Sequence, residues 1–235
     1  MDNWDPALLN SLAKERRVII FDSLGIGESG GEAPTKVEGW SDIAASLIRV
    51  LSLESSDVLG WSLGGEVAQV LSMKYPKLVR KIILAATMPP GGLPEVTWSS
   101  NWLEAASNPR PSNENVLELF YTNSKASRAA GIASFSRMQN PPAAYVSPSA
   151  MSAQAQAIRG YGENLGDWFE RLKEISSPTF VSNGDRDGLF PAIDSAILAR
   201  EIPQSRLSIY PDSGHGFLFQ YFERFSEDVL RFLND

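Results

Sequence analysis

The sequence predicts an α/β protein whose mostly parallel, open sheet is flanked by helices. Short apolar or β-branched runs alternate with longer segments of helical periodicity along most of the chain. These runs are continuously apolar, which is typical of strands buried on both faces of a parallel sheet. A glycine-flanked serine also stands where one run passes into a helical segment, and such a strand–turn–helix junction is common in this fold class.

Five runs are expected to form strands, because each is short and rich in apolar or β-branched residues. They cover residues 17–21, 57–59, 79–85, 179–182 and 206–210. Helical segments lie around them, at residues 5–14, 37–53, 66–75, 191–202 and 219–232. Proline ends two of these helices, after Tyr75 and after Ile202.

The pattern changes over residues 91–170, which we expect to form a helical lid inserted into a core made of residues 1–90 and 171–235. Proline pairs interrupt this stretch, and residues 113–124 keep a helical pattern between them. A second helix is expected to start at Ser147-Pro148 and to stop at Gly160. Most aromatic residues of this segment should pack the lid, and a few should line an apolar pocket: Trp98, Trp102, Phe120, Tyr121, Phe135, Tyr145, Tyr161 and Trp168.

Ser62 is the first candidate catalytic residue. It lies in Gly60-Trp61-Ser62-Leu63-Gly64, after an apolar run and before a helical segment. Glycines on either side permit a close, strained backbone that projects the serine hydroxyl away from its neighbours. The motif alone is a modest signal, and its strand–turn–helix setting strengthens it.

His215 is the only histidine of the chain and therefore the only candidate for the base that activates a serine. It stands in a glycine-rich loop after the expected strand at residues 206–210. A lone histidine is more often an ordinary packing or surface residue. The position of this one, late in the chain after the serine and an acidic loop, favours catalysis.

An acidic loop after the expected strand at residues 179–182 supplies the third candidate. It contains Asp185 and Asp187, either of which would orient an imidazole and stabilise its protonated form. Acidic residues in a glycine-rich turn also satisfy local backbone donors, and for either aspartate alone that explanation is the better one. Three motifs in the order Ser, Asp, His, each after a strand, favour the catalytic reading.

These motifs together resemble the α/β-hydrolase superfamily, in particular its small esterase-like and haloperoxidase-like members. Residues 22–29 resemble the family's Asp-x-x-Gly-x-Gly-x-Ser segment, and residues 184–191 its Gly-x-x-Asp-x-x-x-Pro pattern. The second alignment implies that Asp187 is the acid. The resemblance covers nearly the whole chain, more loosely between about residues 95 and 170.

The resemblance implies a serine hydrolase that cleaves a small, mostly apolar ester, lactone or related acyl compound. Ser62 would be the nucleophile, His215 the base and Asp187 the orienting acid, and the Leu63 amide would donate to the oxyanion. Trp61, Leu189 and Phe217 are expected to contact the substrate. No cofactor and no metal are implied. Carbon–carbon bond hydrolysis and lyase chemistry use the same residues in related families.

The beginning of the chain departs from the family pattern. Family members open with three strands and a His-Gly loop that gives one oxyanion donor, and none of these precedes the helix at residues 5–14. Without the third strand, residues 18–21 would be separated from Val58-Leu59. Three explanations remain open: a shortened sequence, a sheet that closes up by a shift, or another chain in the gap. The rival function is accordingly a weakened or inactive homologue that acts as a binding or partner-dependent module.

Composition narrows the partners. The 235 residues carry a net charge of −7, which argues against nucleic acid because phosphates attract basic faces. No apolar run reaches the length of a membrane span, and no signal peptide is visible, so we expect a cytoplasmic protein. Cysteine is absent, which excludes disulfides and thiolate sites. The expected partners are a small-molecule substrate and, at the open sheet edge, a second copy of the chain.

Overall fold

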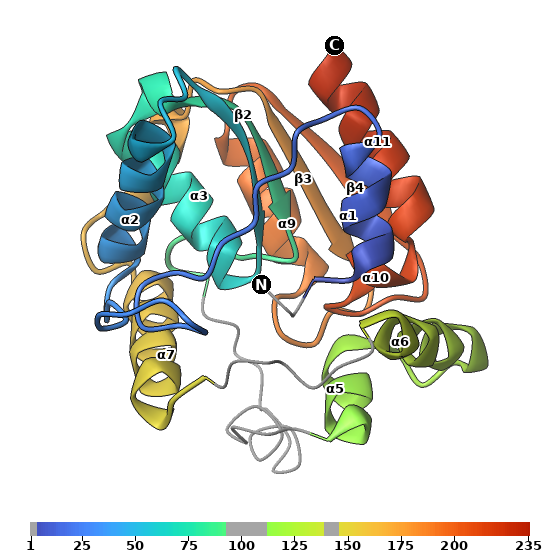
Figure 1. The fold of residues 1–235 in the computed structure, drawn as a ribbon. Helices are drawn as coiled ribbons and strands as arrows, with labels where there is room; N and C mark the ends of the chain where they lie inside the picture. Colours follow the sequence, from blue (N-terminus) through green and yellow to red (C-terminus); the bar gives the residue numbers. More distant parts are fainter. Residues whose placement is uncertain (1–3, 93–111, 139–145) are drawn as a thin grey trace.

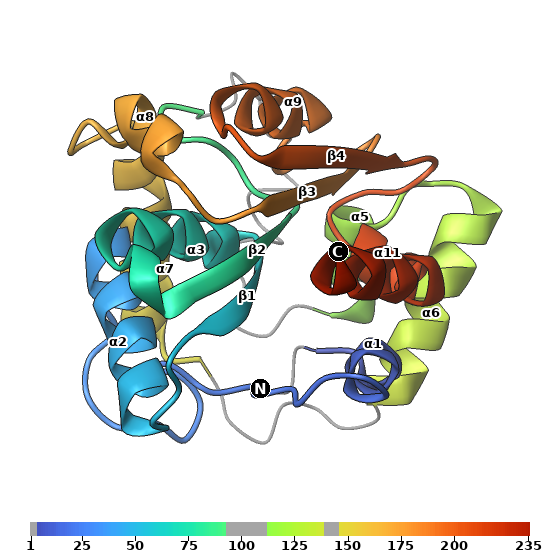
Figure 2. The same ribbon diagram turned by 90° about the horizontal axis from the view of Figure 1, so that it is seen from above.

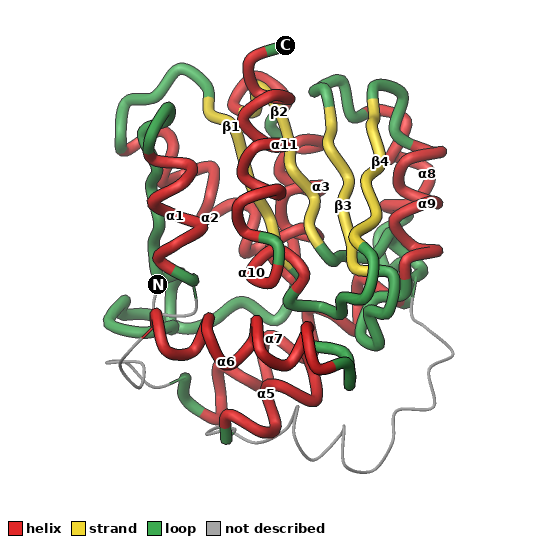
Figure 3. The backbone as a smooth tube through the Cα atoms, turned by 90° about the vertical axis from the view of Figure 1, so that its right-hand side faces the viewer, coloured by secondary structure: helices red, strands yellow, loops and turns green. Residues whose placement is uncertain are grey.

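The structure is a computed structural model that describes residues 4–92, 112–138 and 146–235. A four-stranded sheet lies at its centre, with the strands in the order β1-β2-β3-β4 (Figure 3). The strands are β1 (Ser56–Trp61), β2 (Val79–Ala85), β3 (Thr179–Gly184) and β4 (Ser205–Tyr210). All three neighbouring pairs are parallel, which confirms the predicted fold class and four of the five expected strands.

Alternating side chains of the central strand divide the interior into two cores. Ile82 and Leu84 face one side of the sheet, while Ile83 and Ala85 face the other. The first side is covered by α2 (Val37–Val50), α3 (Leu63–Lys74) and α9 (Ala192–Glu201), and the second by α1 (Pro6–Ala13) and α11 (Phe222–Asn234). Figure 2 shows the resulting three layers from above. The strands are continuously apolar because both faces are buried.

Local signals set the ends of these helices. Asp5 caps α1, since its carboxylate accepts from the Ala7 backbone N–H at 2.8 Å, and Pro6 follows at the first helical position. The α3 helix ends at Lys74, before Tyr75-Pro76, as the proline predicts. Two helices stand in place of the one expected at residues 219–232: α10 (Phe217–Gln220) and, after it, α11.

The described part of residues 91–170 is mainly helical. Its helices are α5 (Asn113–Phe120), α6 (Lys125–Met138), α7 (Pro148–Gly162) and α8 (Trp168–Arg171). Outside this stretch, short 3-10 turns occur at Pro76–Leu78 and Leu172–Glu174. The predicted starts at Asn113 and Pro148 are confirmed, with Ser112 and Ser147 as caps. The α6 helix was not predicted, because its buried positions are Ser127, Gly131 and Ser134 rather than large apolar residues. Trp98, Trp102 and Tyr145 lie outside the described residues, and the domain boundaries at residues 90 and 170 stay a prediction.

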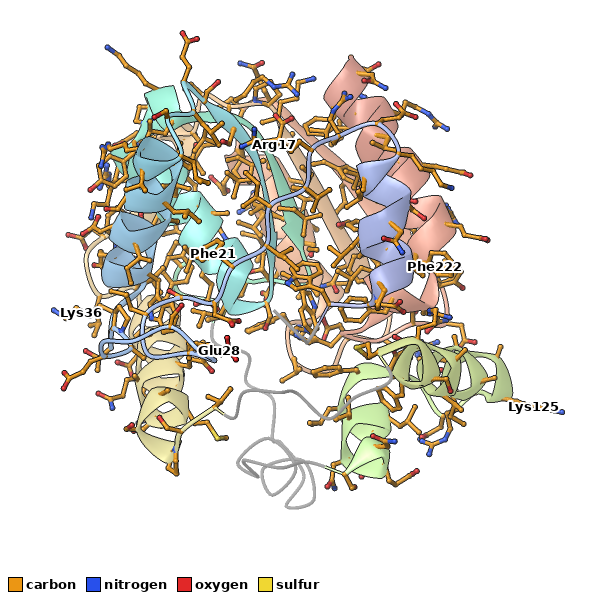
Figure 4. All side chains as sticks on the ribbon, in the orientation of Figure 1. Arg17, Phe21, Glu28, Lys36, Lys125 and Phe222 are labelled. Atoms are coloured by element: carbon orange, nitrogen blue, oxygen red, sulfur yellow. The ribbon has the colours of Figure 1, made fainter. Side chains whose placement is uncertain are left out.

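The expected strand at residues 17–21 is wrong. This segment runs extended between α1 and α2 but pairs with no strand of the described structure. Figure 4 labels its two ends, Arg17 and Phe21. Its apolar side chains are exposed: Val18 by 37%, Ile19 by 41%, Ile20 by 37% and Phe21 by 45%. An extended run becomes a strand only when a neighbour receives its backbone hydrogen bonds, and in the described structure this segment joins no sheet.

The sheet therefore does not close up by a shift of this segment toward Val58-Leu59. Within the described residues β1 hydrogen-bonds to β2 alone, so its outer edge is open. Open edges with nearby apolar side chains are places where further strands add. No helix of the described chain is both long enough and apolar enough to cross a membrane.

We predict that copies of the chain associate through this edge and the exposed segment beside it. Phe21→Lys places a charge among the exposed apolar side chains, and should shift the protein from dimer to monomer in light scattering coupled to size-exclusion chromatography. Ile132→Lys is the matched control, because Ile132 is 56% exposed on α6. A wild-type protein that remains monomeric at the highest soluble concentration would contradict the prediction.

Candidate active site

Ser62 stands at the turn between β1 and α3 with an unusual backbone conformation. Its φ of 58° and ψ of −128° lie in a region that residues with a side chain seldom occupy. Two hydrogen bonds hold the turn: the Ser62 N–H donates to the Ala85 carbonyl at 3.0 Å, and the Gly65 N–H donates to the Ser62 carbonyl at 2.8 Å. The strain is therefore imposed by the neighbouring strand and helix, as expected for a serine at a sharp strand-to-helix turn.

Close approach requires glycine at two positions around this turn. A Cβ on Gly60 would lie 2.2 Å from the Gly64 carbonyl oxygen, and one on Gly65 would lie 2.5 Å from the Thr87 Cβ. A Cβ on Gly64 would meet nothing within 4 Å. Packing therefore requires glycine at positions 60 and 65, whereas the sequence motif contains Gly60 and Gly64.

Leu63 is the first residue of α3 and follows Ser62 directly. The first N–H groups of a helix have no acceptor within the helix, and the helix dipole adds partial positive charge at this end. The amide of Leu63 is therefore suited to receive a negative oxygen that forms next to Ser62.

Asp187 is held in a tight loop after β3 and is hydrogen-bonded to His215. Its Oδ1 accepts from the backbone N–H groups of Leu189 at 2.8 Å and Phe190 at 3.1 Å. Its Oδ2 lies 2.9 Å from His215 Nδ1. Asp187 is 6% exposed and His215 only 1%. Both carboxylate oxygens are thus hydrogen-bonded, which is what a buried carboxylate needs.

Asp185 points elsewhere and is partly exposed. Its Oδ1 accepts from the Ser213 N–H at 3.2 Å, and its Oδ2 lies 3.7 Å from Arg186 Nε. Asp185 therefore joins the loop before His215 to the end of β3, which is the local role that acidic residues in turns commonly have.

The loop that carries His215 packs closely on β3 and α5. A Cβ on Gly184 would lie 2.4 Å from the Ser213 carbonyl oxygen, and one on Gly214 would lie 2.8 Å from the Phe120 carbonyl oxygen. The Gly216 N–H also donates to Phe120 at 2.8 Å. Glycines at these positions let the acid loop, the histidine loop and the end of α5 meet.

Aromatic rings surround the His215 imidazole. The ring centroids of Trp61 and Phe120 each lie 5.3 Å from the imidazole centroid, and that of Phe190 lies 5.6 Å away. Trp61 also donates from Nε1 to the His215 carbonyl at 3.0 Å. Because Trp61 precedes Ser62, this contact brings the serine turn to the histidine loop. Ser62 and His215, both in the described part of the chain, are not hydrogen-bonded to each other. Catalytic hydrogen bonds of this kind often form only when substrate binds.

The three residues expected to contact substrate have different surroundings. Trp61 is half-buried against Trp4, Phe120, His215 and Phe219. Leu189 is half-buried and packs against the core on the α3 side of the sheet. Phe217 is 0% exposed and packs against Tyr210 and Phe225, which leaves it no surface for a substrate. Phe120 was among the aromatic residues expected to pack the lid or line a pocket, whereas Phe190 was not singled out, because its place beside His215 depends on long-range packing.

Two buried acids near these residues also went unpredicted. Glu66 lies one helical turn after Ser62, is 0% exposed, and has no hydrogen-bond partner on either carboxylate oxygen. Burial raises its pKa well above the ordinary value. Asp194, in the first turn of α9, is 6% exposed, and its Oδ2 has no partner. Both lie in segments that read as ordinary amphipathic helix.

Across residues 4–92, 112–138 and 146–235, no group of three or more His, Asp or Glu side chains is placed to hold a metal ion. The arrangement instead offers a strained serine, a helix N-terminus, and a buried imidazole with one nitrogen hydrogen-bonded to a carboxylate.

Comparison with known proteins agrees with the fold. A family model described as alpha/beta hydrolase fold matches residues 1–221. The chain belongs to the α/β-hydrolase fold family. An α/β-hydrolase fold protein from Chitinophaga pinensis superposes with a TM-score of 0.91 at 34% identity, covering 100% of this chain and 85% of that structure.

Two characterised relatives are hydrolases. A poly(3-hydroxyalkanoate) depolymerase from Ectopseudomonas oleovorans is 30% identical over 96% of this chain and 77% of its own length. A 2-hydroxymuconate semialdehyde hydrolase from Pseudomonas putida is 26% identical over 94% of this chain and 78% of its own length. This α/β-hydrolase is therefore an enzyme of the hydrolase type.

The strained turn yields a prediction that separates strain from loss of the hydroxyl. Ser62→Gly and Ser62→Ala both remove the hydroxyl, but only glycine relaxes at a φ of 58°. Ser62→Gly should therefore have a Tm higher than Ser62→Ala by about 2–4 °C, which corresponds to about 1 kcal/mol in a chain of this size. Equal Tm values in calorimetry would show that the turn stores no strain.

The contrast between the two aspartates yields another. Asp187→Asn should lower kcat by about 10³–10⁴-fold, because the amide favours the wrong imidazole tautomer. Asp185→Asn serves as the matched control and should cost less than about tenfold, since its side chain contacts a backbone amide and Arg186 rather than His215. Equal losses, or a larger loss at Asp185, would mean that the acid is wrongly assigned.

Proposed function

We propose that this α/β-hydrolase is a serine hydrolase that cleaves small, mostly apolar esters, lactones or related acyl compounds. The observation that carries the proposal is the buried hydrogen bond of 2.9 Å between Asp187 and His215, beside a serine in a strained turn. A nucleophile, a base and a group that orients the base are the three parts that acyl transfer requires.

The hydrogen bond to Asp187 sets the chemistry of the imidazole. An ionised carboxylate only accepts, so Nδ1 carries the proton and Nε2 is left as the acceptor in the neutral ring. That tautomer suits a base that takes the Ser62 proton. The aromatic rings around His215 keep water from competing for the imidazole.

Catalysis would then proceed in two halves. Ser62 Oγ attacks the carbonyl carbon and gives its proton to His215 Nε2, and the carbonyl oxygen becomes a tetrahedral oxyanion. The C–O bond to the leaving group breaks, and His215 returns the proton to the departing alkoxide, which leaves an acyl-Ser62. In the second half a water gives its proton to His215, attacks the acyl carbon, and the acid is released as Ser62 regains its proton.

The Leu63 amide would bind the oxyanion in both halves, because it lies at the N-terminus of α3 immediately after the nucleophile. One donor is worth about 3–4 kcal/mol of transition-state stabilisation.

Apolar substrates are favoured by the surroundings of the base. Aromatic surface surrounds His215, contributed by Trp61, Phe120 and Phe190. Such a surface binds hydrocarbon groups better than it binds charged groups. The name of the Ectopseudomonas relative also points to hydroxyalkanoate esters, and an ester of this kind suits the proposed chemistry. The name of the Pseudomonas relative keeps carbon–carbon bond hydrolysis as an outcome for substrate screening.

We expect a fluorophosphonate probe to label the wild-type chain once, at Ser62, with the loss of fluoride. Intact-mass and peptide mass spectrometry should find the adduct in wild type but not in Ser62→Ala, and hydrolysis of p-nitrophenyl butyrate should follow the same pattern. Ser55→Ala, an exposed serine before β1, is the matched control and should label like wild type. A wild-type chain that is folded, unlabelled and inactive would favour a binding module instead.

A further inference from the structure

Asp212 is an exposed aspartate that links the loop before His215 to the turn between α5 and α6. Its Oδ1 accepts from the Thr122 hydroxyl at 2.7 Å, and its Oδ2 accepts from the Ser124 hydroxyl at 2.6 Å. These hydrogen bonds, first that from Ser124 and then that from Thr122, lower the pKa of Asp212. Both carboxylate oxygens therefore serve to hold a segment that is distant in the sequence.

A second series of hydrogen bonds joins the same segments. The buried Ser127 hydroxyl accepts from the Thr122 N–H at 2.9 Å and donates to Gln220 Oε1 at 2.7 Å. Gln220, at the end of α10, donates from Nε2 to the Asp212 carbonyl at 2.8 Å. The α6 helix also packs against α10 (Figure 1). We term the five residues Asp212, Thr122, Ser124, Ser127 and Gln220 the Asp212 network.

The backbone of Asp212 has a left-handed conformation, with a φ of 49°. Aspartate tolerates this region better than most residues, and glycine adopts it without a steric penalty. The conformation persists because surrounding contacts fix it, and here those contacts are the hydrogen bonds of the Asp212 network. Glycine at this position would therefore remove the carboxylate without disturbing the backbone.

Phe120 is the residue that this network holds beside the base. It ends α5, two residues before Thr122. Its carbonyl accepts from the Gly216 N–H at 2.8 Å, and its ring centroid lies 5.3 Å from that of His215 and 5.4 Å from that of Trp61. Among the rings around the imidazole, this one belongs to α5 rather than to a strand end or to the acid loop. Its position therefore depends on how α5 is held against the histidine loop.

We propose that Asp212 is a positioning residue that holds Phe120 against His215, and that the ring of Phe120 in this place limits the length of the acyl group that the enzyme accepts. The inference rests on the proposed function, because acyl selection matters only where Ser62 forms an acyl-enzyme. An acyl group on Ser62 must lie within reach of His215 to be hydrolysed, so it lies among the rings around the imidazole. Asp212 touches no reacting atom and acts through the α5–α6 turn.

Loss of the Asp212 network should widen acyl selection and spare the chemistry. The hydrogen bond between Asp187 and His215 does not involve the network, so the base keeps its orientation. A displaced Phe120 ring makes room for longer chains and loses its contact with short ones. Because that contact is present in both the ground state and the transition state, its loss raises KM and leaves kcat nearly unchanged.

Asp212→Gly tests this directly, with p-nitrophenyl esters from acetate to dodecanoate as substrates. KM for the butyrate should rise about fivefold, with kcat within about twofold of wild type. The ratio of kcat/KM for the octanoate to that for the butyrate should rise by about fivefold or more. Asp167→Gly is the matched control, because Asp167 is also exposed, has a φ of 56°, and makes no capping hydrogen bond with its side chain. It should leave both values unchanged.

Variants on the α5 side keep the test decisive if Asp212→Gly does not fold. Thr122→Val removes one of the two hydroxyl donors and should shift the chain-length ratio in the same direction by less, whereas Thr122→Ser keeps the hydroxyl and should match wild type. Phe120→Ala should widen the profile by itself. Adding Asp212→Gly to Phe120→Ala should widen it no further, because both changes act through the same ring.

Hydrogen exchange measured by mass spectrometry reports the link without any substrate. The amides of α5 should exchange about fivefold faster in Asp212→Gly than in wild type, because the variant loosens the turn that follows this helix. Asp167→Gly should exchange like wild type over the same residues. A merely local role of Asp212 would leave α5 unchanged.

The two hypotheses fail in different ways. A wild type without esterase activity would overturn the proposed function, while faster exchange of α5 in Asp212→Gly would still support the hold on this helix. With an active wild type, a folded Asp212→Gly that keeps the wild-type chain-length ratio, or an equal change in Asp167→Gly, would overturn the role of Asp212. A wild-type ratio in Phe120→Ala would overturn the role of Phe120.

Discussion

Parallel pairing of the four strands is the constraint on which the rest of the structure depends. The register sets Trp61 beside Ala85, Ala85 beside Ser182, and Gly184 beside Tyr210. The C-terminal ends of the strands therefore lie side by side, and the serine, acid and histidine loops all leave the sheet at these ends. Because β2 sends alternate side chains into two separate cores, the register cannot slip by one residue without exposing both cores. The site is thus held by the most deeply buried part of the molecule.

Burial around His215 has opposing consequences. Enclosing a carboxylate and an imidazole is costly, but Asp187 recovers much of that cost through two backbone N–H groups and the imidazole itself. Glu66 and Asp194 receive no such compensation on their buried oxygens. These two acids and the positive φ of Ser62 each make the free energy of folding less favourable. The packing of the two cores offsets this loss.

The open edge of β1 shows how far secondary structure depends on neighbours. Residues 17–21 have the composition of a buried strand, yet they are exposed and unpaired in the described structure. Val79–Ala85 has a similar composition and is a strand, because β1 and β3 flank it. The same local preference therefore gives a strand in one place and an extended connection in the other.

The sequence alone determined the α/β class, four strands, several helix starts, and the candidates Ser62, Asp187 and His215, because these depend on local periodicity, capping residues and glycine-rich turns. The helices that begin at Val37, Asn113 and Pro148 end at Val50, Phe120 and Gly162, not at residues 53, 124 and 160 as predicted. Only the tertiary structure decided what requires distant segments to meet. It brought Asp187 within hydrogen-bond distance of His215, buried Phe217 in the core, and placed Phe120 and Phe190 around the imidazole. It also left residues 17–21 outside the sheet and enclosed Asp194. Burial and long-range hydrogen bonding arise from packing between elements, and one-dimensional patterns do not specify which elements pack together.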